Sequence, residues 1–575
     1  MTTLSATVTR TVKHNSPPRW RHWSVGWTLS SVLIGLFVSI PLITVVSHVF
    51  LSGSGNWQHL ASTVLPGYVS NSLLLMLGVG CLSTVIGVGT AWCISAFSFP
   101  GRDWLAWAQL LPLAMPAYIL AYCYTDLLEF AGPVQTALRD WFDLQPRSYY
   151  FPEIRSLGGA IVVLSLVLYP YTYLLTRAAF NSRSMCAIEA GRTLGCSGHS
   201  VFWRVALPLA RPAILAGLAL VLMETLADFG AVDYFGVATF TTGIFRTWFG
   251  MFDATAALQL SAVLLGFVVL LLALERYSRG HSRYNETTDR VKPTVPIELR
   301  SRTRWLVTCG CAAPVVLGFI IPSSQLVWLA SRRWQAALET GFLELLWNSV
   351  SLAMMTALIV LVPAFVLVFA QRNKPNTATL SAIRFSTSGY AIPGTVIALA
   401  VLIPFGMIDN AIDRAMEVVF GWNTGLLLSG TLFTLIFAYC VRFLTAAFNS
   451  LESGLAQLKP SVEEAAYTLG ATRHRVLKDL YVPAIRGSVL TAILIVFVDT
   501  LKELPATLVL RPFNFNTLAV KTYELASDER LSEAALPALA IVCAGLIPVI
   551  LISRGIRRSR PGLDTIGSQH GHQLP

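Results

Sequence analysis

Four acidic residues stand inside otherwise apolar stretches of this chain of 575 residues. Glu224 and Asp228 are one helical turn apart, and Asp499 and Glu503 repeat that spacing 275 positions later. Carboxylates within a membrane span are costly and indicate function, and hard cations prefer oxygen ligands. The pattern predicts a cation pathway lined by four carboxylates. Two simpler explanations stay open: helix-end carboxylates that meet interfacial water, and a local ion pair between Lys502 and one acid.

Tyrosines and histidines offer further ligand chemistry. The candidate phenols are Tyr118, Tyr122, Tyr124, Tyr169, Tyr171 and Tyr173. Such residues more often lie at the membrane interface as aromatic anchors. His199 and His474 recur 275 positions apart and can titrate, but contact with a partner is the favoured interpretation. His570 and His572 are too sparse for a metal site.

The composition indicates that membrane helices position these acids. The chain is 54% hydrophobic and 13% charged, with a mean hydropathy of +0.61, whereas soluble domains carry about 25% charged residues. The nine cysteines are scattered mostly through apolar runs, without a CxxC pair, and are expected to be small core residues. The first 22 residues are polar and basic, so no cleavable signal is expected.

Twelve stretches reach the roughly 20 apolar residues that a membrane helix needs. Lipid offers no partner to an exposed backbone, so each stretch is expected to be helical. The twelve are 27–50, 69–97, 104–128, 157–180, 209–232, 254–274, 305–330, 345–369, 385–408, 424–443, 483–498 and 534–553. Five prolines within them predict kinks rather than breaks, at Pro112, Pro116, Pro170, Pro393 and Pro404.

The basic residues predict the orientation. With the N-terminus in the cytoplasm, the inner segments hold 31 of the 42 Lys and Arg residues and the outer segments hold 11. Inner loops of membrane proteins carry this excess, so both termini are expected in the cytoplasm. The net charge of +11 then requires no nucleic acid partner. The outer side holds 20 of the 31 acids, a hint of a cationic cargo.

The chain also repeats itself. Segments 189–211 and 464–486 share nine of 23 aligned positions. Six spans separate the copies, so the repeats are parallel and predict a pseudo-two-fold axis along the membrane normal, with a pathway between the halves. The predicted parts are an N-terminal tail (1–26), a first half (27–276), a flexible linker (277–304), a second half (305–553) and a C-terminal tail (554–575).

Each repeated segment predicts a helix, a glycine turn and a second helix on the cytoplasmic face. In the second copy, Ser461 and Glu464 match a capping box, Gly470 permits the turn, and Thr472 can cap a second helix that ends before Pro483. The first copy has Gly195, Ser197 and Pro208 in the same places, with Cys186 in place of the capping serine. An amphipathic hairpin on the bilayer is the alternative, but the duplication favours docking onto a partner.

The repeated Glu-Ala segment, with Gly six residues after Glu and Pro thirteen after Gly, resembles the "EAA" loop of binding-protein-dependent ABC importer permeases. The matching residues are Glu189, Ala190, Gly195 and Pro208, and Glu464, Ala465, Gly470 and Pro483. The first copy departs at Gly191, where the family usually has alanine. The resemblance implies an all-α integral membrane fold, with twelve transmembrane helices as a tandem pseudo-dimer of two six-helix type I permease halves. It also implies docking loops, at 181–208 and 449–483, for two copies of a cytoplasmic ABC ATPase subunit.

Longer strings resemble the ferric iron permeases of this superfamily. They are METLADFG (223–230) and TFTTGIFR (239–246) in the first half, and KELPATL (502–508), RPFNFNTL (511–518) and YELASD (523–528) in the second. The resemblance implies that Fe³⁺ is the transported substrate, delivered by an extracytoplasmic binding protein across a bacterial inner membrane. Because carboxylates suit a hard cation, we hypothesise that Glu224, Asp228, Asp499 and Glu503 form a Fe³⁺ relay that receives the ion from this binding protein. No covalently bound cofactor is expected.

The chain has no Gly-Lys dipeptide and cannot form a Walker phosphate loop, so a partner must use the ATP and the chain is expected to be a transport subunit, not an enzyme. Three alternatives remain. The cargo could be thiamine, a polyamine or a phosphonate; the protein could be a secondary carrier with parallel repeats; or it could be a membrane enzyme, although no catalytic constellation is visible.

Overall fold

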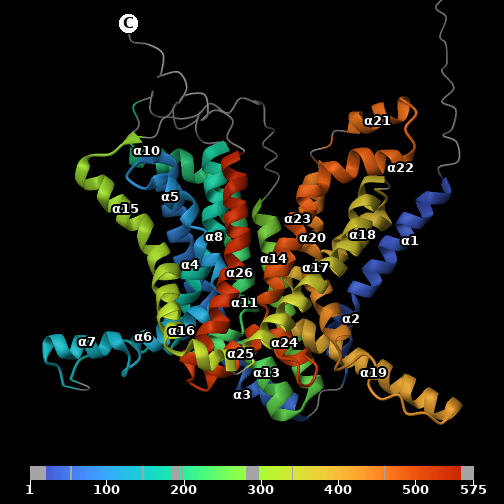
Figure 1. Cartoon of the computed structure of the whole chain (residues 1–575), viewed down its shortest axis with the longest axis horizontal. Helices are drawn as coiled ribbons and strands as arrows, with labels where there is room; N and C mark the ends of the chain where they lie inside the picture. Colours follow the sequence, from blue (N-terminus) through green and yellow to red (C-terminus); the bar gives the residue numbers. More distant parts are fainter. Residues whose placement is uncertain are drawn as a thin grey trace, which may run out of the picture.

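The computed structural model is a bundle of helices (Figure 1). It describes residues 21–51, 55–145, 148–182, 195, 198–279, 297–339, 341–373, 375–456, 458 and 460–558. Within these ranges, ten helices are long and apolar enough to cross a membrane, and two bent helix pairs can raise the number to twelve. The predicted all-α membrane fold is confirmed.

The helices follow the two-part order of the sequence. The first half contains α1 (Arg21–Val38), α2 (Ile40–Val49), α3 (Gly55–Thr63), α4 (Leu65–Ala96), α5 (Arg102–Ala108), the 3₁₀ turn η1 (Leu111–Ala114), α6 (Ala117–Leu128), α7 (Pro133–Phe142), α8 (Leu157–Ser182), α10 (Gly198–Val201), the π turn η2 (Phe202–Ala206), α11 (Leu207–Ala227), α12 (Gly230–Tyr234), α13 (Phe240–Met251) and α14 (Ala254–Arg279). The second half contains α15 (Ser301–Val315), the π turn η3 (Val316–Ile320), α16 (Ile321–Glu339), α17 (Phe342–Asn373), α18 (Thr377–Ser386), the 3₁₀ turn η4 (Gly389–Ala391), α19 (Gly394–Phe420), α20 (Leu432–Ala456), α21 (Pro460–Thr468), α22 (Arg473–Val476), the π turn η5 (Leu477–Tyr481), α23 (Val482–Leu501), α24 (Pro505–Leu510), α25 (Leu518–Ser527) and α26 (Leu531–Arg558).

The duplication is visible in local geometry. Gly195 and Gly470 both have a left-handed backbone, with φ of 82° and 83°. After each glycine comes a four-residue helix, a five-residue π turn and a long helix, as α10–η2–α11 and as α22–η5–α23, displaced by 275 residues. Only glycine adopts this backbone without steric cost, so both repeats use the same residue for the same turn.

Two proline sites break the helix instead of kinking it. Pro116 and Pro393 immediately precede α6 and α19, and the residues before them, Met115 and Ile392, are extended (ψ 111° and 126°). A residue before proline is sterically pushed out of the helical region. The segments 102–114 and 117–142 therefore meet at 93°. The expectation of mere kinks was wrong at these two duplicated sites, whereas Pro170 and Pro404 lie inside the continuous helices α8 and α19.

The first helices of each half pack against the other half. Helix α1 lies on α17 and α18, while α15 lies on α4 and α5; Figure 1 shows α1 and α15 on opposite flanks. Helix α16 contacts α6 of the first half but packs mainly on α26 of its own half. The Asn376 side chain donates to the Thr28 hydroxyl at 2.9 Å, and the Gln109 side chain donates to the Cys311 carbonyl at 2.6 Å. The first helix of each half therefore packs against the opposite half, so these helices are exchanged between the halves.

A short strand pair adds to this exchange. Strand β1 (Phe97–Ser98), in the first half, pairs in parallel with β2 (Ile297–Glu298). Residues 297–304 were expected to belong to a flexible tether, but β2 and the start of α15 order them. The expected tether was therefore too long at its C-terminal end.

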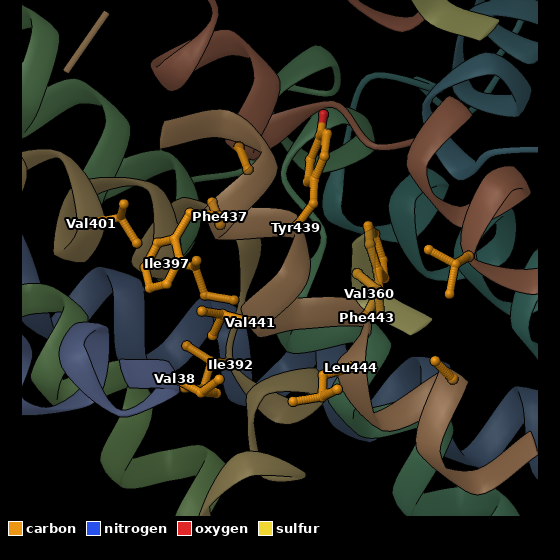
Figure 2. Close-up of a cluster of buried hydrophobic side chains, with 14 of the residues drawn as sticks. Val38, Val360, Ile392, Ile397, Val401, Phe437, Tyr439, Val441, Phe443 and Leu444 are labelled. Atoms are coloured by element: carbon orange, nitrogen blue, oxygen red, sulfur yellow. The ribbon is translucent and has the colours of Figure 1, made fainter. Parts of the chain in front are cut away.

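The apolar core crosses the boundary between the halves. Val38 of α1 belongs to the same buried cluster as Val360 of α17 and Ile392, and Figure 2 shows Val38 beside Ile392. Buried apolar area is the main stabilising contribution. Among the described cysteines, Cys123 and Cys311 are buried, but Cys81, Cys309 and Cys543 are exposed. The expectation of core cysteines therefore holds only in part.

Candidate site in a cavity between the two halves

A cavity of about 150 Å³ lies between the halves. Its walls come from the breaks that precede α6 and α19, from α8 and α11, and from α20 and α23. Its polar lining consists of Glu224, Asp228, Asp499, Glu503, Arg442, Lys502, Tyr118, Tyr171 and Tyr390. The fold thus brings both acid pairs to one cavity, although 275 residues separate them.

The carboxylate of the second acid in each pair accepts hydrogen bonds from the first turn of a short helix. Asp228 accepts a hydrogen bond from the Val232 amide at 3.1 Å, at the start of α12. Glu503 accepts from the amides of Ala506 (3.1 Å) and Thr507 (3.3 Å), at the start of α24. These carboxylates therefore satisfy amides of a first helical turn that would otherwise lack acceptors. The sequence analysis missed this capping role, which the Pro505 after Glu503 could have indicated.

The first acid of each pair has a side-chain partner. Glu224 accepts a hydrogen bond from the Tyr390 hydroxyl at 3.0 Å. Asp499 forms an ion pair with the Lys502 ammonium at 2.8 Å, one turn further along the chain. The local ion pair that the sequence left open is present, and it involves Asp499.

Arg442 adds a second basic group to the cavity. Its guanidinium lies 3.5 Å from a Glu503 carboxylate oxygen, and the two side chains are only 15% and 3% exposed. A methyl group at Gly394 would come within 2.5 Å of both Arg442 and Glu503, so the ends of these two side chains would have to shift. The sequence analysis missed Arg442, although an arginine within the predicted span 424–443 was itself a signal.

The cavity is acidic overall. Four carboxylates and two basic groups leave a formal charge of −2 on its lining. Among the described residues, no three His, Cys, Asp or Glu side chains are grouped so that they could hold one metal ion. The carboxylates are instead separately paired with a tyrosine, a lysine, an arginine and backbone amides.

The tyrosines divide into two sets. Tyr169 donates to the Gln109 side chain at 2.9 Å, Tyr173 donates to the Ala106 carbonyl, and Tyr124 donates to the Leu317 carbonyl, both at 2.7 Å. These three phenols hold helices together. Tyr171 and Tyr118 line the cavity, as does Tyr390, which the sequence analysis missed. The hydroxyls of Tyr118 and Tyr122 are buried without a hydrogen-bond partner among the described residues.

The halves are also tied together near α12 and α25. The Tyr523 hydroxyl of α25 donates to the Asp233 carboxylate of α12 at 2.6 Å. Burial raises the pKa of the Tyr523 hydroxyl above its ordinary value, so it remains a donor. Arg155 also bridges Glu129 of the first half (2.7 Å) and Glu529 of the second (3.6 Å). Helix α25 lies at the opposite end of the bundle from α21 and α22 (Figure 1).

The second repeated loop forms a helical hairpin, as predicted. Helix α21 ends at Thr468, Gly470 turns the chain, and the Thr472 hydroxyl accepts from the Arg475 amide at 3.4 Å at the start of α22. The capping expectation for Ser461 was wrong, because α21 already begins at Pro460. The second helix does not end before Pro483 but continues through η5 into α23. Glu464 is exposed.

The first repeated loop is described only in part. Gly195 and Pro208 have the geometry reported above for α10, η2 and α11. Glu189, Ala190, Cys186 and Ser197 lie outside the described residues, as do His570 and His572. The His199 ring lies 6.2 Å from the Trp203 ring, measured between centroids. Figure 1 places α10 and α22 at the same end of the bundle.

One arginine connects the second hairpin to the bundle. Arg372, at the end of α17, donates to the carbonyls of Leu455 and Leu458, each at 3.0 Å. It also lies 3.4 Å from the Glu463 carboxylate of α21, and these two side chains are 17% and 18% exposed. Its guanidinium is 5.7 Å from the ring centre of Tyr481, in η5. The end of α20, the segment after it, α21 and η5 therefore all contact the Arg372 guanidinium.

Comparison with known proteins agrees with this architecture. Residues 24–277 match the family described as "Binding-protein-dependent transport system inner membrane component". The chain is 27% identical, over 94% of its length and 98% of the relative's, to the Fe(3+)-transport system permease protein FbpB 2 of Haemophilus influenzae. The first half of the chain thus matches this family of inner membrane transport components, and its whole length is similar to a permease. This likeness, together with the candidate membrane spans of the described residues, is typical of a multi-pass transport component.

Other relatives match a smaller share of this chain. It is 22% identical to the ferric transport system permease protein FbpB of Actinobacillus pleuropneumoniae, over 84% of this chain and 71% of that protein. It is 29% identical to the molybdenum transport system permease protein ModB of Haemophilus influenzae, over 33% of this chain and 84% of that protein. The likeness extends along both halves for two permeases whose names specify ferric transport. It also extends along both halves for the probable ABC transporter permease protein y4fN of Sinorhizobium fredii, which is 22% identical over 83% of this chain and 85% of that protein.

Proposed function

We propose that this permease imports ferric iron delivered by an extracytoplasmic binding protein, and that ATP hydrolysis by two copies of a separate ABC ATPase drives the transport. The observation that carries the proposal is the cavity, where two acid pairs from parallel halves, partly offset by Arg442 and Lys502, leave a formal charge of −2. Fe³⁺ is a hard cation that suits carboxylate and phenol oxygens. The likeness of the whole chain to an Fe(3+)-transport permease supports the same cargo.

Within the cavity, we assign the first contact with the cation to Glu224 and Asp499. Asp228 and Glu503 are already engaged by the amides of α12 and α24. The Tyr118 side chain is 5% exposed and its hydroxyl has no partner among the described residues, so it offers an uncommitted oxygen to the cavity. A buried polar group without a partner is costly, and a transported cation would remove that cost.

The two repeated loops are proposed to dock onto the ATPases. The docking residues are Glu189, Ala190, Gly195 and Pro208 in the first loop, and Glu464, Ala465, Gly470 and Pro483 in the second. Closure of the ATPases would draw both loops together and reorient the halves around the cavity. This scheme needs both loops and both termini in the cytoplasm. A cysteine in place of the exposed Ser461 should react with an impermeant thiol reagent only from the cytoplasmic side, and labelling from outside would reject the scheme.

The main test is uptake of radiolabelled Fe³⁺ by cells that express the permease with its binding protein and ATPase. Glu224→Gln removes one carboxylate charge and keeps the shape of the side chain. At an effective dielectric constant of about 20, a unit charge about 4 Å from a cation contributes about 4 kcal/mol. Solvent in the cavity reduces that figure, so we expect uptake to fall at least roughly tenfold. The matched control is Glu417→Gln, an exposed acid on α19 that should leave uptake unchanged.

Two outcomes would reject the proposal. If the wild-type permease does not accumulate Fe³⁺ but does accumulate thiamine, a polyamine or a phosphonate, the cargo is wrong. If uptake persists when the ATPase loses its catalytic glutamate, the permease works as a secondary carrier. Retention of ATP hydrolysis by the Glu224→Gln complex would show that the variant still assembles.

A further inference from the structure

The two halves contribute different charges to the cavity. The 275-residue offset pairs Lys502 of the second half with Ala227 of the first, and both residues line the cavity. Among the described residues, Glu224 and Asp228 have no basic side chain within ion-pair distance, whereas Asp499 and Glu503 each have one. The carboxylates without an ion pair therefore belong to the first half, and both basic groups belong to the second.

The two basic groups are held differently. Arg442 is 15% exposed and is confined by Gly394 and Glu503. Lys502 retains 36% of its side-chain surface, lies in the cavity wall, and its ammonium contacts Asp499, which is 18% exposed. A lysine carries its charge on a flexible four-carbon stem. The Lys502 side chain therefore has more room to move within the cavity than the Arg442 side chain has.

We propose that Lys502 is a resident cation that keeps the cavity from binding its cargo too tightly. This inference rests on the proposed import of a cation. With the cavity empty, the ammonium neutralises Asp499. When Fe³⁺ approaches Glu224 on the first-half side, the ammonium repels it and competes for Asp499. A conducting site must bind strongly enough to admit an ion and weakly enough to release it. The acids of the first half, which have no ion-pair partner among the described residues, make binding strong enough to admit the ion. Lys502 makes binding weak enough to release it.

The proposal predicts opposite effects for the two members of the ion pair. Lys502→Met changes the formal charge of the lining from −2 to −3, so Fe³⁺ should bind roughly tenfold more tightly while turnover falls. Asp499→Asn changes the charge to −1, so binding should weaken. The double variant Asp499→Asn with Lys502→Met restores −2 and should return affinity towards the wild-type value. A purely structural ion pair would give both single variants the same loss of stability and no opposite shift in affinity.

The measurement is equilibrium binding of radiolabelled Fe³⁺, supplied as its citrate complex, to the permease–ATPase complex in lipid nanodiscs, together with uptake in cells. The matched control is Lys521→Met, because Lys521 also pairs with an acid three residues away, Glu524 at 3.8 Å, and does not line the cavity. Lys502→Arg keeps the charge and should behave nearly as the wild type does. Thermal unfolding of each complex identifies variants that fail to fold, and the double variant then provides the test.

The results separate this inference from the proposed function. If wild-type protein takes up Fe³⁺ but Lys502→Met binds it no more tightly than Lys521→Met does, the resident-cation proposal is wrong and the import proposal stands. If wild-type protein takes up no Fe³⁺, the proposed function itself fails. If Lys502→Arg loses turnover as completely as Lys502→Met, the shape of lysine matters rather than its charge, which also overturns the proposal.

Discussion

Arg372 should control the order of the second docking hairpin. The substitution Arg372→Met removes two charge-assisted hydrogen bonds to the carbonyls of Leu455 and Leu458, each at 3.0 Å, and the contact with Glu463. Hydrogen bonds to charged groups contribute about 1.5–3 kcal/mol each. Arg372 and Glu463 are 17% and 18% exposed, so solvent screens part of the energy of these interactions. We therefore expect Arg372→Met to lower the local stability of the hairpin by about 3 kcal/mol.

The assay is amide hydrogen exchange followed by mass spectrometry on the purified permease in nanodiscs. A local loss of about 3 kcal/mol should speed exchange in α21 roughly a hundredfold. Exchange in α8, within the first half, should not change. Arg332→Met is the matched control, because Arg332 also stacks on an aromatic ring, 3.9 Å above Trp328, but lies on α16 away from the hairpin. Unchanged exchange in α21 of Arg372→Met would refute the reasoning, and so would an equal increase in the control.

Two further substitutions test the packing. Gly545→Ala places a methyl group 2.7 Å from the Ala114 carbonyl oxygen, between α26 and η1, and should lower the free energy of unfolding by about 1–3 kcal/mol. The control is Gly266→Ala, whose methyl group meets no atom within 4 Å and should not destabilise the protein. Equal melting temperatures for the two variants would contradict this account. The buried Asp409 carboxylate accepts hydrogen bonds from the amides of Leu427, Leu428 and Ser429 and from the Ser429 hydroxyl. Asp409→Asn weakens these bonds, by about 2–4 kcal/mol in total. Limited proteolysis should therefore cut segment 421–431 faster, by a factor that reflects this loss. Asp140→Asn, at an exposed site on α7, is its control, and a cleavage rate that matches this control would show that the Asp409 bonds do not hold the loop.

The sequence was most informative where one residue type serves one physical need. Hydropathy located the membrane helices because each needs an apolar length, and Gly470 marked its turn because only glycine tolerates that backbone easily. The duplication placed the acid pairs at equivalent positions, and the structure places both pairs at one cavity.

What the sequence did not show depends on contacts between distant segments. Arg442 and Tyr390 reach the cavity only because the halves pack face to face, and no local pattern predicts that. The exchange of α1 and α15 between halves was also missed, because the halves were delimited along the chain and hydropathy cannot tell which neighbour a helix will choose. The helix breaks at Pro116 and Pro393 were underestimated, since the effect of proline depends on whether neighbouring helices can accommodate an extended residue before it.

Because α1 packs against the second half, its tertiary contacts can form only late in biogenesis. The side chain of Asn376 that bonds to Thr28 is synthesised 348 residues later, so α1 must wait in the bilayer without its partner until α17 and α18 emerge from the ribosome. Pairing across such a sequence distance slows folding. Fusing both halves in one polypeptide keeps the waiting helix at a high effective concentration near its partner, and a ribosome that stalls after the first half would leave an orphaned helix for the quality-control proteases of the membrane.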